Sequence, residues 1–191
     1  MLRIAGVDEA GRGPWAGPVV AAAVILRTGS LSVRIDDSKR LSARQRERAF
    51  RAILRQGDIG VGIACAEEID QRNILQATLH AMAQALRELP EPPDLVLIDG
   101  TQTPPVSFPC QAIPHGDHLS YPISCASIVA KVLRDEMMRF YDRLYPHFSF
   151  HQHKGYGTQR HAEALERWGP SFLHRRSFEP VEGWLLMHGQ P

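Results

Sequence analysis

The fold is decided by the stretch LRIAGVDEAGRGPWAGPVVAAAVIL, which occupies residues 2–26. Residues 2–7 and 19–26 are apolar runs of strand length, and the segment between them is rich in glycine and proline. Short apolar runs bounded by such turn residues are typical of buried strands. The stretch therefore predicts two strands joined by a glycine-rich turn, with Asp8 and Glu9 at the end of the first strand.

Two helices are predicted on either side of a third strand at residues 58–64. Ser42 and Gln45 have the spacing of a capping box, so we expect a helix from there to about residue 56, where Gly57 ends it. Asn73 can cap the second helix, and Pro90 ends it. The apolar positions of this second helix recur every three or four residues, as on one buried stripe, at Leu75, Leu79, Met82, Leu86 and Leu89.

The remaining elements are two short strands and two helices. Residues 95–98 and 111–113 have the apolar pattern of strands, and a long helix is predicted from Ser124 to about residue 144. From about residue 147 the chain is rich in histidine, arginine and aromatic residues, and it predicts one short helix at about residues 158–168. The apolar face of the long helix would comprise Leu133, Met137, Phe140 and Leu144.

This order of elements predicts an α/β fold, a mixed sheet flanked by helices, with a small helical C-terminal extension. The first three strands follow one another as an antiparallel meander, and the helix after them is long enough for a parallel crossover to the fourth. With 191 residues and 43% hydrophobic content, the chain is expected to form a single domain at 1–191.

Composition excludes several protein classes. No apolar run reaches the roughly 20 residues of a membrane helix, and no secretory signal opens the sequence, so we expect a soluble, cytoplasmic protein. Cys65, Cys110 and Cys125 are odd in number and widely spaced, which favours reduced, buried thiols. We expect a monomer, because no apolar helix stripe is left without a predicted role.

The formal net charge is only +1, but the basic residues gather in two segments. Residues 34–55 contain eight basic and three acidic side chains, and residues 147–176 contain five basic and two acidic ones. Both segments could line a phosphate backbone. A solvated helix face explains the first of them about as well.

Acidic side chains follow two of the predicted strands. Asp8 and Glu9 end one strand, Asp99 ends another, and Asp117 precedes the long helix. If the two strands are neighbours, the first three carboxylates converge, and Asp117 can supply a fourth near the positive end of the helix. Four clustered carboxylates repel one another unless cations neutralise them. All-oxygen ligands favour Mg²⁺ or Mn²⁺ over zinc, and two such ions can hydrolyse a phosphodiester. Each residue taken alone is more typical of a turn or a helix cap.

The chain resembles ribonuclease HII over nearly its whole length, starting with GVDEAGRGP at residues 6–14 and AGPVVAAAV at residues 16–24. The chain departs from the usual pattern at Trp15, His115, Ser124 and Cys125. The later matches, in order, are DSK at 37–39, LIDG at 97–100, GD at 116–117, ASI at 126–128, AKV at 130–132, RD at 134–135, HKGYGT at 153–158, HR at 174–175 and SF at 177–178.

The resemblance implies a ribonuclease H-like fold and a nuclease that uses Mn²⁺ or Mg²⁺. It implies that Asp8, Glu9, Asp99 and Asp117 form the catalytic and metal-binding set. The substrate would be an RNA/DNA hybrid, or a DNA duplex that contains ribonucleotides. Cleavage would fall 5′ of the ribonucleotide and leave a 3′-hydroxyl and a 5′-phosphate.

The resemblance also assigns substrate contacts, some of them in the segment from about residue 147 onward. The backbone of Gly11, Arg12 and Gly13 would contact the ribonucleotide's 2′-hydroxyl, the group that separates RNA from DNA locally. Tyr156 would stack on the sugar of the next, deoxy, nucleotide. Lys39 and Lys154 lie inside the resembling motifs, and we expect them to contact phosphates.

Other interpretations stay open at this point. The chain could be a non-catalytic module that binds hybrid duplexes, or a nuclease of the same fold that acts on DNA alone. His147, His151 and His153 could share a zinc ion. Tyr156 could be ordinary packing, and Lys39, Lys154 and Arg175 could be solvated surface charges.

Overall fold

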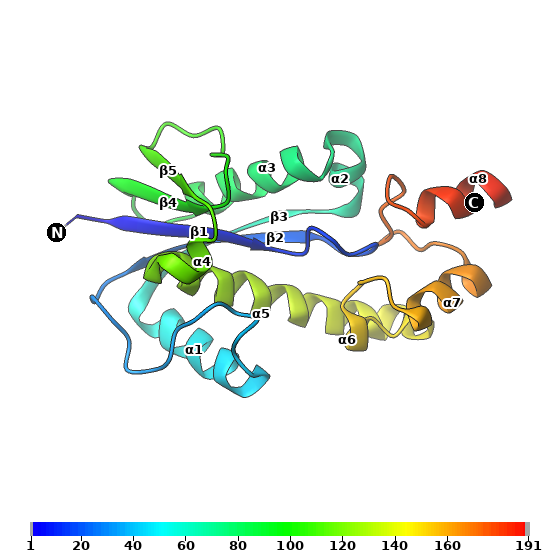
Figure 1. Cartoon of the computed structure of the whole chain (residues 1–191), viewed down its shortest axis with the longest axis horizontal. Coiled ribbons are helices and arrows are strands. Elements are labelled where there is room, and N and C mark those ends of the chain that lie inside the picture. Colours follow the sequence, from blue (N-terminus) through cyan, green and yellow to red (C-terminus); the bar gives the residue numbers. More distant parts are fainter. Residues whose placement is uncertain (1, 190–191) are drawn as a thin grey trace.

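A computed structural model describes residues 2–189, and it is built around a five-stranded mixed sheet (Figure 1). The strand order is β3-β2-β1-β4-β5. β1 pairs antiparallel with β2 and parallel with β4; β2 pairs antiparallel with β3, and β4 parallel with β5. The strands are β1 Ile4–Ala10, β2 Val19–Leu26, β3 Gly57–Ala64, β4 Leu95–Asp99 and β5 Cys110–Ile113.

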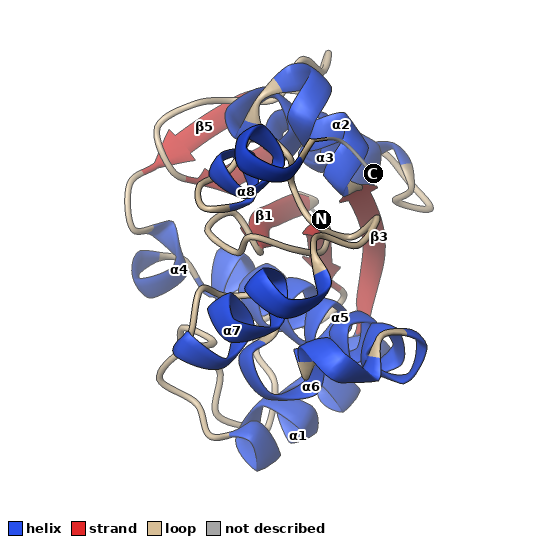
Figure 2. Ribbon diagram, turned by 90° about the vertical axis from the view of Figure 1, so that its right-hand side faces the viewer, coloured by secondary structure: helices blue, strands red, loops and turns tan. Residues whose placement is uncertain are grey.

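Helices cover both faces of the sheet. α2 (Ala66–Arg72) and α3 (Ile74–Arg87) lie on one face, while α1 (Ala43–Gln56) and α5 (Tyr121–Leu144) lie on the other (Figures 1 and 2). Each face buries its own cluster of apolar side chains, because alternate residues of β1 and β2 point to opposite faces. The predicted α/β class, with a mixed sheet flanked by helices, is confirmed.

The predicted helix starts on either side of β3 are also confirmed. Ser42 caps α1: its hydroxyl accepts from the Gln45 amide while the Gln45 side chain accepts from the Ser42 amide. Asn73 caps α3 by accepting from two amides of its first turn, which satisfies donors that have no partner inside the helix. α2 was not predicted as a separate helix.

The buried face of α5 differs from the predicted one. The helix begins at Tyr121 instead of Ser124, and Phe140 and Leu144 are 55% and 58% exposed. The buried positions toward its C-terminal end are instead Arg134 and Met138. The prediction was wrong because this end of α5 extends past the sheet and packs on the glycine-rich loop and the C-terminal segment. There the Arg134 guanidinium donates to backbone carbonyls of both segments.

The C-terminal segment forms a small helical layer at the far end of α5 (Figure 1). It attaches to the loop between β1 and β2 through a bridge between Ala16 and His174 and a hydrogen bond from Gly17 N to Leu173 O of 2.8 Å. Its helices are η1 Pro146–Phe148, α6 Phe150–His153, α7 Gln159–Trp168 and α8 Val181–His188, of which only α7 was predicted.

The cysteines and the helices test two further predictions. All three cysteines are free, as predicted, but only Cys125 is buried; Cys110 is partly exposed and Cys65 is exposed, so their predicted burial was wrong for these two. Cys65 is exposed because it lies at the N-cap position of α2, at the end of an edge strand. Between residues 2 and 189, no helix has both the length and the apolarity to cross a bilayer.

Candidate active site

The sheet brings the predicted acidic residues to one place. Val7 of β1 pairs with Ile98 of β4 in parallel register, so Asp8 and Asp99 follow on adjacent strands. Parallel neighbours end at the same edge of a sheet, where open α/β folds commonly place functional groups. Asp8, Glu9, Asp99 and Asp117 all line one cavity of about 330 Å³.

Asp117 reaches the cavity through α4 (Gly116–Leu119), which leads into α5. The Gly116 amide donates to Asp99 Oδ1 at 2.7 Å, and Ser124 Oγ donates to the Asp117 carbonyl at 2.8 Å. The first turn of α5 also lies directly against β1, where a Cβ atom on Gly6 would lie 2.0 Å from the Pro122 carbonyl carbon. Glycine at position 6 therefore allows α4 to hold Asp117 beside the strands.

The electrostatics of this cavity leave negative charge poorly compensated. Burial raises the pKa of Asp8 well above its usual value, and the nearby charges of Glu9 and Asp99 raise it further. Burial also raises the pKa of Glu9, against the lowering effect of Arg12, whose guanidinium is 3.5 Å away. Lys131 lines the cavity too, but its ammonium already pairs with Asp135 at 2.8 Å. Such a site fits a divalent cation with oxygen ligands.

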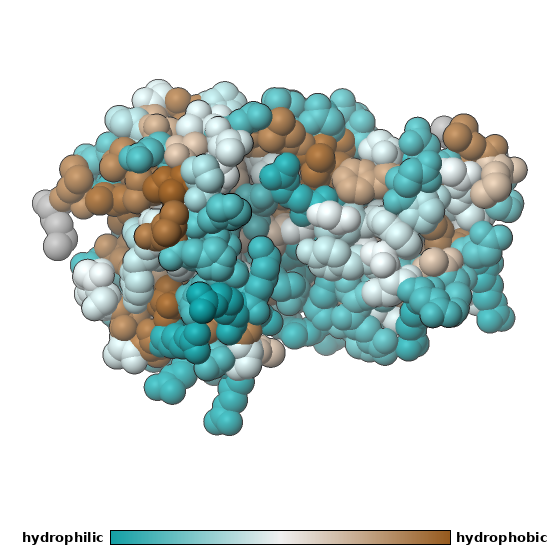
Figure 3. Space-filling model, in the orientation of Figure 1, coloured by the Kyte–Doolittle hydropathy of each residue, from teal (hydrophilic) through white to brown (hydrophobic). Residues whose placement is uncertain are grey.

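Polar side chains surround the mouth of this cavity. In Figure 3, hydrophilic groups lie among hydrophobic ones over the left part of this face, where α4 and the loop between β2 and α1 lie in Figure 1. That loop contributes Ser38 and the exposed Lys39 to the cavity wall. Ser127 of α5 donates to Ser38 Oγ at 3.0 Å and also contacts Asp8. The loop is thereby joined to the acidic set.

The glycine-rich loop after β1 forms another wall, with Gly11, Arg12 and Gly13 among its lining residues. Gly11 has φ +100°, and a Cβ there would lie 2.0 Å from Arg134 Nε. Only glycine accepts both the left-handed backbone and this approach without strain. The loop therefore carries backbone, not side chains, to the cavity at position 11.

Two buried arginines hold this loop, and sequence reasoning did not find this role. Arg134 donates to the carbonyls of Pro18 (2.9 Å), Lys154 (3.0 Å) and Ala16 (3.3 Å). Arg175 donates to the carbonyls of Gly11, Arg12 and Gly17. Arg175 has no exposed surface, so its interpretation as a solvated charge was wrong. Arg134 lies four residues from Ala130 and from Met138, both of which are buried, and this spacing was the available signal for its burial.

The remaining predicted contact residues are placed differently from one another. Tyr156 is 45% exposed and lines the acidic cavity. Lys154 is not among the residues that line it; its ammonium donates to the His151 carbonyl, and partial burial lowers its pKa. The structure thus brings Lys39 and Tyr156, but not the Lys154 side chain, to the acidic set.

The histidines proposed for zinc do not meet. His151 pairs with Asp142 at 2.7 Å, His153 is buried against the Phe148 carbonyl, and the His147 ring contacts Trp168. Within residues 2–189, the one group of potential metal ligands close enough to share an ion is Asp37, Asp117 and His118. His118 Nε2 lies 3.7 Å from Asp37 Oδ2 and 3.9 Å from Asp117 Oδ1, so it borders the acidic cavity. Sequence reasoning did not identify His118.

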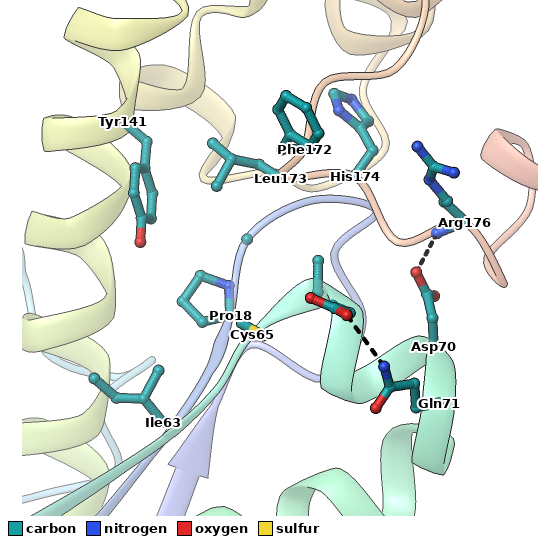
Figure 4. Close-up of a pocket in the computed structure, with 13 residues that line it drawn as sticks. Pro18, Ile63, Cys65, Asp70, Gln71, Tyr141, Phe172, Leu173, His174 and Arg176 are labelled. Carbon is teal, nitrogen blue, oxygen red and sulfur yellow. Dashed lines mark hydrogen bonds between the residues drawn. The ribbon is translucent and has the colours of Figure 1, made fainter. Parts of the chain in front are cut away.

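A larger cavity of about 620 Å³ lies elsewhere, between α2, α5 and residues 172–176 (Figure 4). Ile63, Tyr141 and Leu173 are among its apolar walls. Its two acidic side chains are both engaged: Asp70 accepts from the backbone amide of Arg176 at 2.9 Å, and Glu67 accepts from the Gln71 side chain at 3.2 Å. The smaller cavity brings four carboxylates together, so we place the chemistry there.

Comparison with known proteins identifies the family of this chain. Residues 5–181 match the family model described as ribonuclease HII. A ribonuclease HII of Rhizorhabdus wittichii is 52% identical over 185 residues, covering 97% of this chain and 92% of that protein. The matched region therefore covers almost the entire length of both proteins.

Two solved structures share the fold. The crystal structure of ribonuclease H2 from Pyrococcus horikoshii OT3 has a TM-score of 0.83 at 25% identity, covering 97% of this chain and 98% of that one. The structure of Bst ribonuclease HIII in complex with Mn²⁺ has a TM-score of 0.73 at 17% identity, covering 100% and 71%. From the family match and the identity to its relative, this chain is a metal-dependent ribonuclease that belongs to the ribonuclease HII family.

Proposed function

We propose that the chain is an endoribonuclease that cuts the RNA strand of RNA/DNA hybrids and cuts 5′ of single ribonucleotides in duplex DNA. The products would carry a 3′-hydroxyl and a 5′-phosphate. The observation that carries the proposal is the convergence of four carboxylates in one cavity that the glycine loop and Tyr156 also line. This arrangement supports a site that combines phosphodiester hydrolysis with inspection of the sugar.

Asp8, Glu9, Asp99 and Asp117 would hold the divalent ions, Mg²⁺ or Mn²⁺. The raised pKa values of Asp8 and Glu9 support this assignment, because they reflect burial and neighbouring negative charge that the chain's own basic groups do not fully compensate. When two ions are bound, they would activate the attacking water and neutralise charge on the leaving oxygen. Mn²⁺ in the Bst ribonuclease HIII structure agrees with the choice of ion class.

The protein's own groups would select the sugar. Gly11, Arg12 and Gly13 would present backbone atoms to the 2′-hydroxyl, since glycine at two of these positions leaves no Cβ in the way. The Tyr156 ring, exposed at the cavity's rim, would stack on the neighbouring deoxyribose. Lys39 would contact a phosphate from the cavity wall. The Lys154 ammonium would need to leave the His151 carbonyl to do the same.

Three labelled duplexes of identical sequence test the proposal: one all-deoxy, one with a single ribonucleotide, and one with a continuous RNA strand. We expect Mg²⁺- or Mn²⁺-dependent cleavage of the last two, with the single-ribonucleotide product ending directly 5′ of the ribonucleotide. Equal cleavage of the all-deoxy duplex would favour a DNA nuclease of the same fold. Binding of the hybrid without cleavage at any metal concentration would favour a non-catalytic module.

The remaining parts of the proposal concern how the chain acts. We infer a single domain that works as a cytoplasmic monomer, with the segment from about residue 147 contributing to substrate binding. The backbone bonds between that segment and the glycine loop support its place beside the substrate. Sedimentation of the protein with and without a hybrid duplex checks the monomer: one chain per duplex is expected, and a dimer at micromolar concentration would contradict it.

A further inference from the structure

Three buried histidines lie outside the acidic cavity, and the proposed hydrolysis uses none of them. His153, His161 and His174 come from α6, α7 and the loop before α8, and they are 8%, 0% and 2% exposed. The His153 and His161 rings stack at a centroid distance of 4.5 Å, and the His161 and His174 rings are 5.1 Å apart. Buried polar rings of this kind require hydrogen-bond partners.

Backbone partners determine where each ring carries its proton, because amides only donate and carbonyls only accept. The Ser171 amide donates to His174 Nδ1 at 3.0 Å, so the proton of a neutral His174 is on Nε2. His161 Nδ1 lies 3.0 Å from the Tyr156 carbonyl and therefore carries its proton there. His161 Nε2 is left as an acceptor, and His174 Nε2 donates to it at 3.0 Å. A series of hydrogen bonds, all donating in the same direction, thus runs from the Ser171 amide through both rings to the Tyr156 carbonyl.

The chain of hydrogen bonds requires both rings to be neutral. A protonated His161 would turn an N–H group toward the N–H group of His174 across the 3.0 Å contact. Burial lowers the pKa of His161 to about 4 and that of His174 to about 3, so both rings are uncharged at neutral pH. At that pH the hydrogen bonds therefore run in one direction, from Ser171 toward Tyr156.

The last acceptor in this series of hydrogen bonds is the carbonyl of Tyr156, the residue at the rim of the acidic cavity. The Tyr156 amide donates to the His153 carbonyl at 2.9 Å, while its carbonyl accepts from the His161 ring and from the Thr158 amide, each at 3.0 Å. A Cβ on Gly13 would lie 3.7 Å from Tyr156 Cε1, and the Arg134 guanidinium lies 5.9 Å from the ring centre. Both backbone groups of Tyr156 are thus bonded to buried histidines, the amide to the His153 backbone and the carbonyl to the His161 ring, while the Tyr156 ring lies beside the glycine loop.

We propose that Ser171, His174 and His161 form a positioning relay that sets the Tyr156 backbone, and through it the distance between the Tyr156 ring and the glycine loop. The relay would determine how well the site accepts a deoxyribose next to the ribonucleotide, and so the preference for a single embedded ribonucleotide over a continuous hybrid. This inference rests on the proposed stacking role of Tyr156.

Two amide substitutions at one position separate the two bonds of His161. His161→Asn places an amide near the position of Nδ1, so it keeps a donor for the Tyr156 carbonyl and loses the contact with His174. His161→Gln places its amide near the position of Nε2, so it keeps the contact with His174 and loses the side-chain donor for Tyr156, leaving the Thr158 amide as the remaining donor. His80→Asn, on α3 and bonded to Gln84, is the matched control. Thermal unfolding of each variant identifies those that fold.

The measured quantity is the ratio of kcat/KM on a single-ribonucleotide duplex to that on a continuous hybrid. We expect His161→Asn to stay within about threefold of the wild-type ratio and His161→Gln to lower it about tenfold. In a Tyr156→Ala background, His161→Gln should change the ratio no further. Equal ratios for the Asn and Gln variants, with both folded, would overturn the relay.

A spectroscopic measurement separates failure of the relay from failure of the Tyr156 proposal. Nitrogen-15 NMR of the imidazoles reports which ring nitrogen is protonated. At pH 7 we expect Nδ1–H for His161 and Nε2–H for His174. Nε2–H on His161 would overturn the relay even if Tyr156→Ala lowers the ratio. The expected tautomers together with an unchanged ratio in Tyr156→Ala would overturn the stacking role and, with it, the functional part of the relay.

Discussion

The acidic cavity and the buried pair Arg134 and Arg175 differ in how their buried charges are compensated. In the cavity, Asp8 and Glu9 have raised pKa values, because burial and neighbouring carboxylates disfavour their ionised forms. Behind the glycine loop, Arg134 and Arg175 each donate to three backbone carbonyls. Both regions border the same loop. The charges of the arginine pair are matched by groups of the chain itself, whereas those of the cavity are only partly compensated by its basic side chains.

The difference separates what stabilises the fold from what binds a ligand. A buried charge whose hydrogen bonds are all made by the chain contributes to structure, and removing it leaves its partners unpaired. A cluster of buried like charges costs stability until an external ion neutralises it. Substitutions in the cavity should therefore affect cleavage, and substitutions in the arginine pair should affect folding.

The largest effect is expected for Asp8→Asn. Loss of one carboxylate from the metal-binding set should lower cleavage on the order of 1000-fold or more, since metal-ion stabilisation is worth several kcal/mol. Without metal, the free energy of unfolding should be unchanged or higher at pH 7, because a repulsive charge is gone. Single-turnover cleavage and urea unfolding measure the two effects. Glu88→Gln, at the exposed C-cap of α3, is the matched control and should change neither.

Arg175→Met should show the reverse pattern. The substitution leaves the carbonyls of Gly11, Arg12 and Gly17 without their donor, and unsatisfied buried groups cost roughly 1–3 kcal/mol each. We expect the free energy of unfolding to fall by about 3 kcal/mol or more, measured in urea. Arg55→Met, on the exposed last turn of α1, should change it by less than about 0.5 kcal/mol. Similar losses in both variants would erase the contrast between the two regions.

The pH dependence of stability should distinguish the buried rings of His161 and His174 from the carboxylates of the cavity. The pKa values of His161 and His174 are lowered from 6.5 to about 4 and about 3, so below pH 6.5 the unfolded chain binds more protons than the folded one. Stability from these rings should be complete above pH 6.5 and decline as the pH falls, by up to about 1.4 kcal/mol per pH unit for each ring. Asp8, whose pKa is raised, acts in the opposite sense: its contribution is lost as the pH rises.

Urea unfolding at pH 7, 6 and 5 measures this dependence. The wild-type protein should lose stability over the range, and His161→Gln should lose less, because it has one titrating ring fewer. Asp8→Asn without metal should lose more stability on acidification than the wild type, since it lacks the group that acts in the opposite sense. Parallel curves for all three proteins would contradict both assignments.

How much of this contrast could be predicted from the sequence differs between the two regions. The acidic set was predictable, because short apolar runs identify strands and parallel strands place Asp8 and Asp99 side by side. The arginine pair was not, because the need for a donor depends on which carbonyls of the glycine loop lack partners, and that is a property of the folded loop. The exposed Phe140 and Leu144 have the same origin: they belong to the part of α5 that lies beyond the sheet.

The predicted substrate-contact residues Tyr156 and Lys154 were predictable only in part. The position of Tyr156 at the cavity was predictable from its motif, but the relay behind it was not, since Ser171, His174 and His161 are brought together only by the C-terminal layer. Lys154 shows the limit of the motif. Its backbone carbonyl is held by Arg134, and its ammonium points to the His151 carbonyl.

The smallest effect is expected for Lys39→Ala. Lys39 is exposed on the cavity wall, so its proposed phosphate contact should add a modest, salt-dependent part of substrate affinity. We expect KM to rise a few-fold at 100 mM salt with kcat nearly unchanged, and the slope of log affinity against log salt to decrease by about one. An unchanged slope would remove Lys39 from the substrate contacts. Arg87→Ala, on the exposed last turn of α3 and outside both basic segments, is the control.

The most direct test is the single-turnover rate of cutting a one-ribonucleotide duplex, followed as Mg²⁺ is raised from zero. For the wild-type protein we expect no cleavage in chelator and a rate that rises more steeply than the first power of the ion concentration, as required by more than one ion. For Asp99→Asn we expect background rates throughout. Cleavage of the wild type in chelator, or a wild-type rate for folded Asp99→Asn, would contradict a metal site built by the carboxylates of β1, β4 and α4.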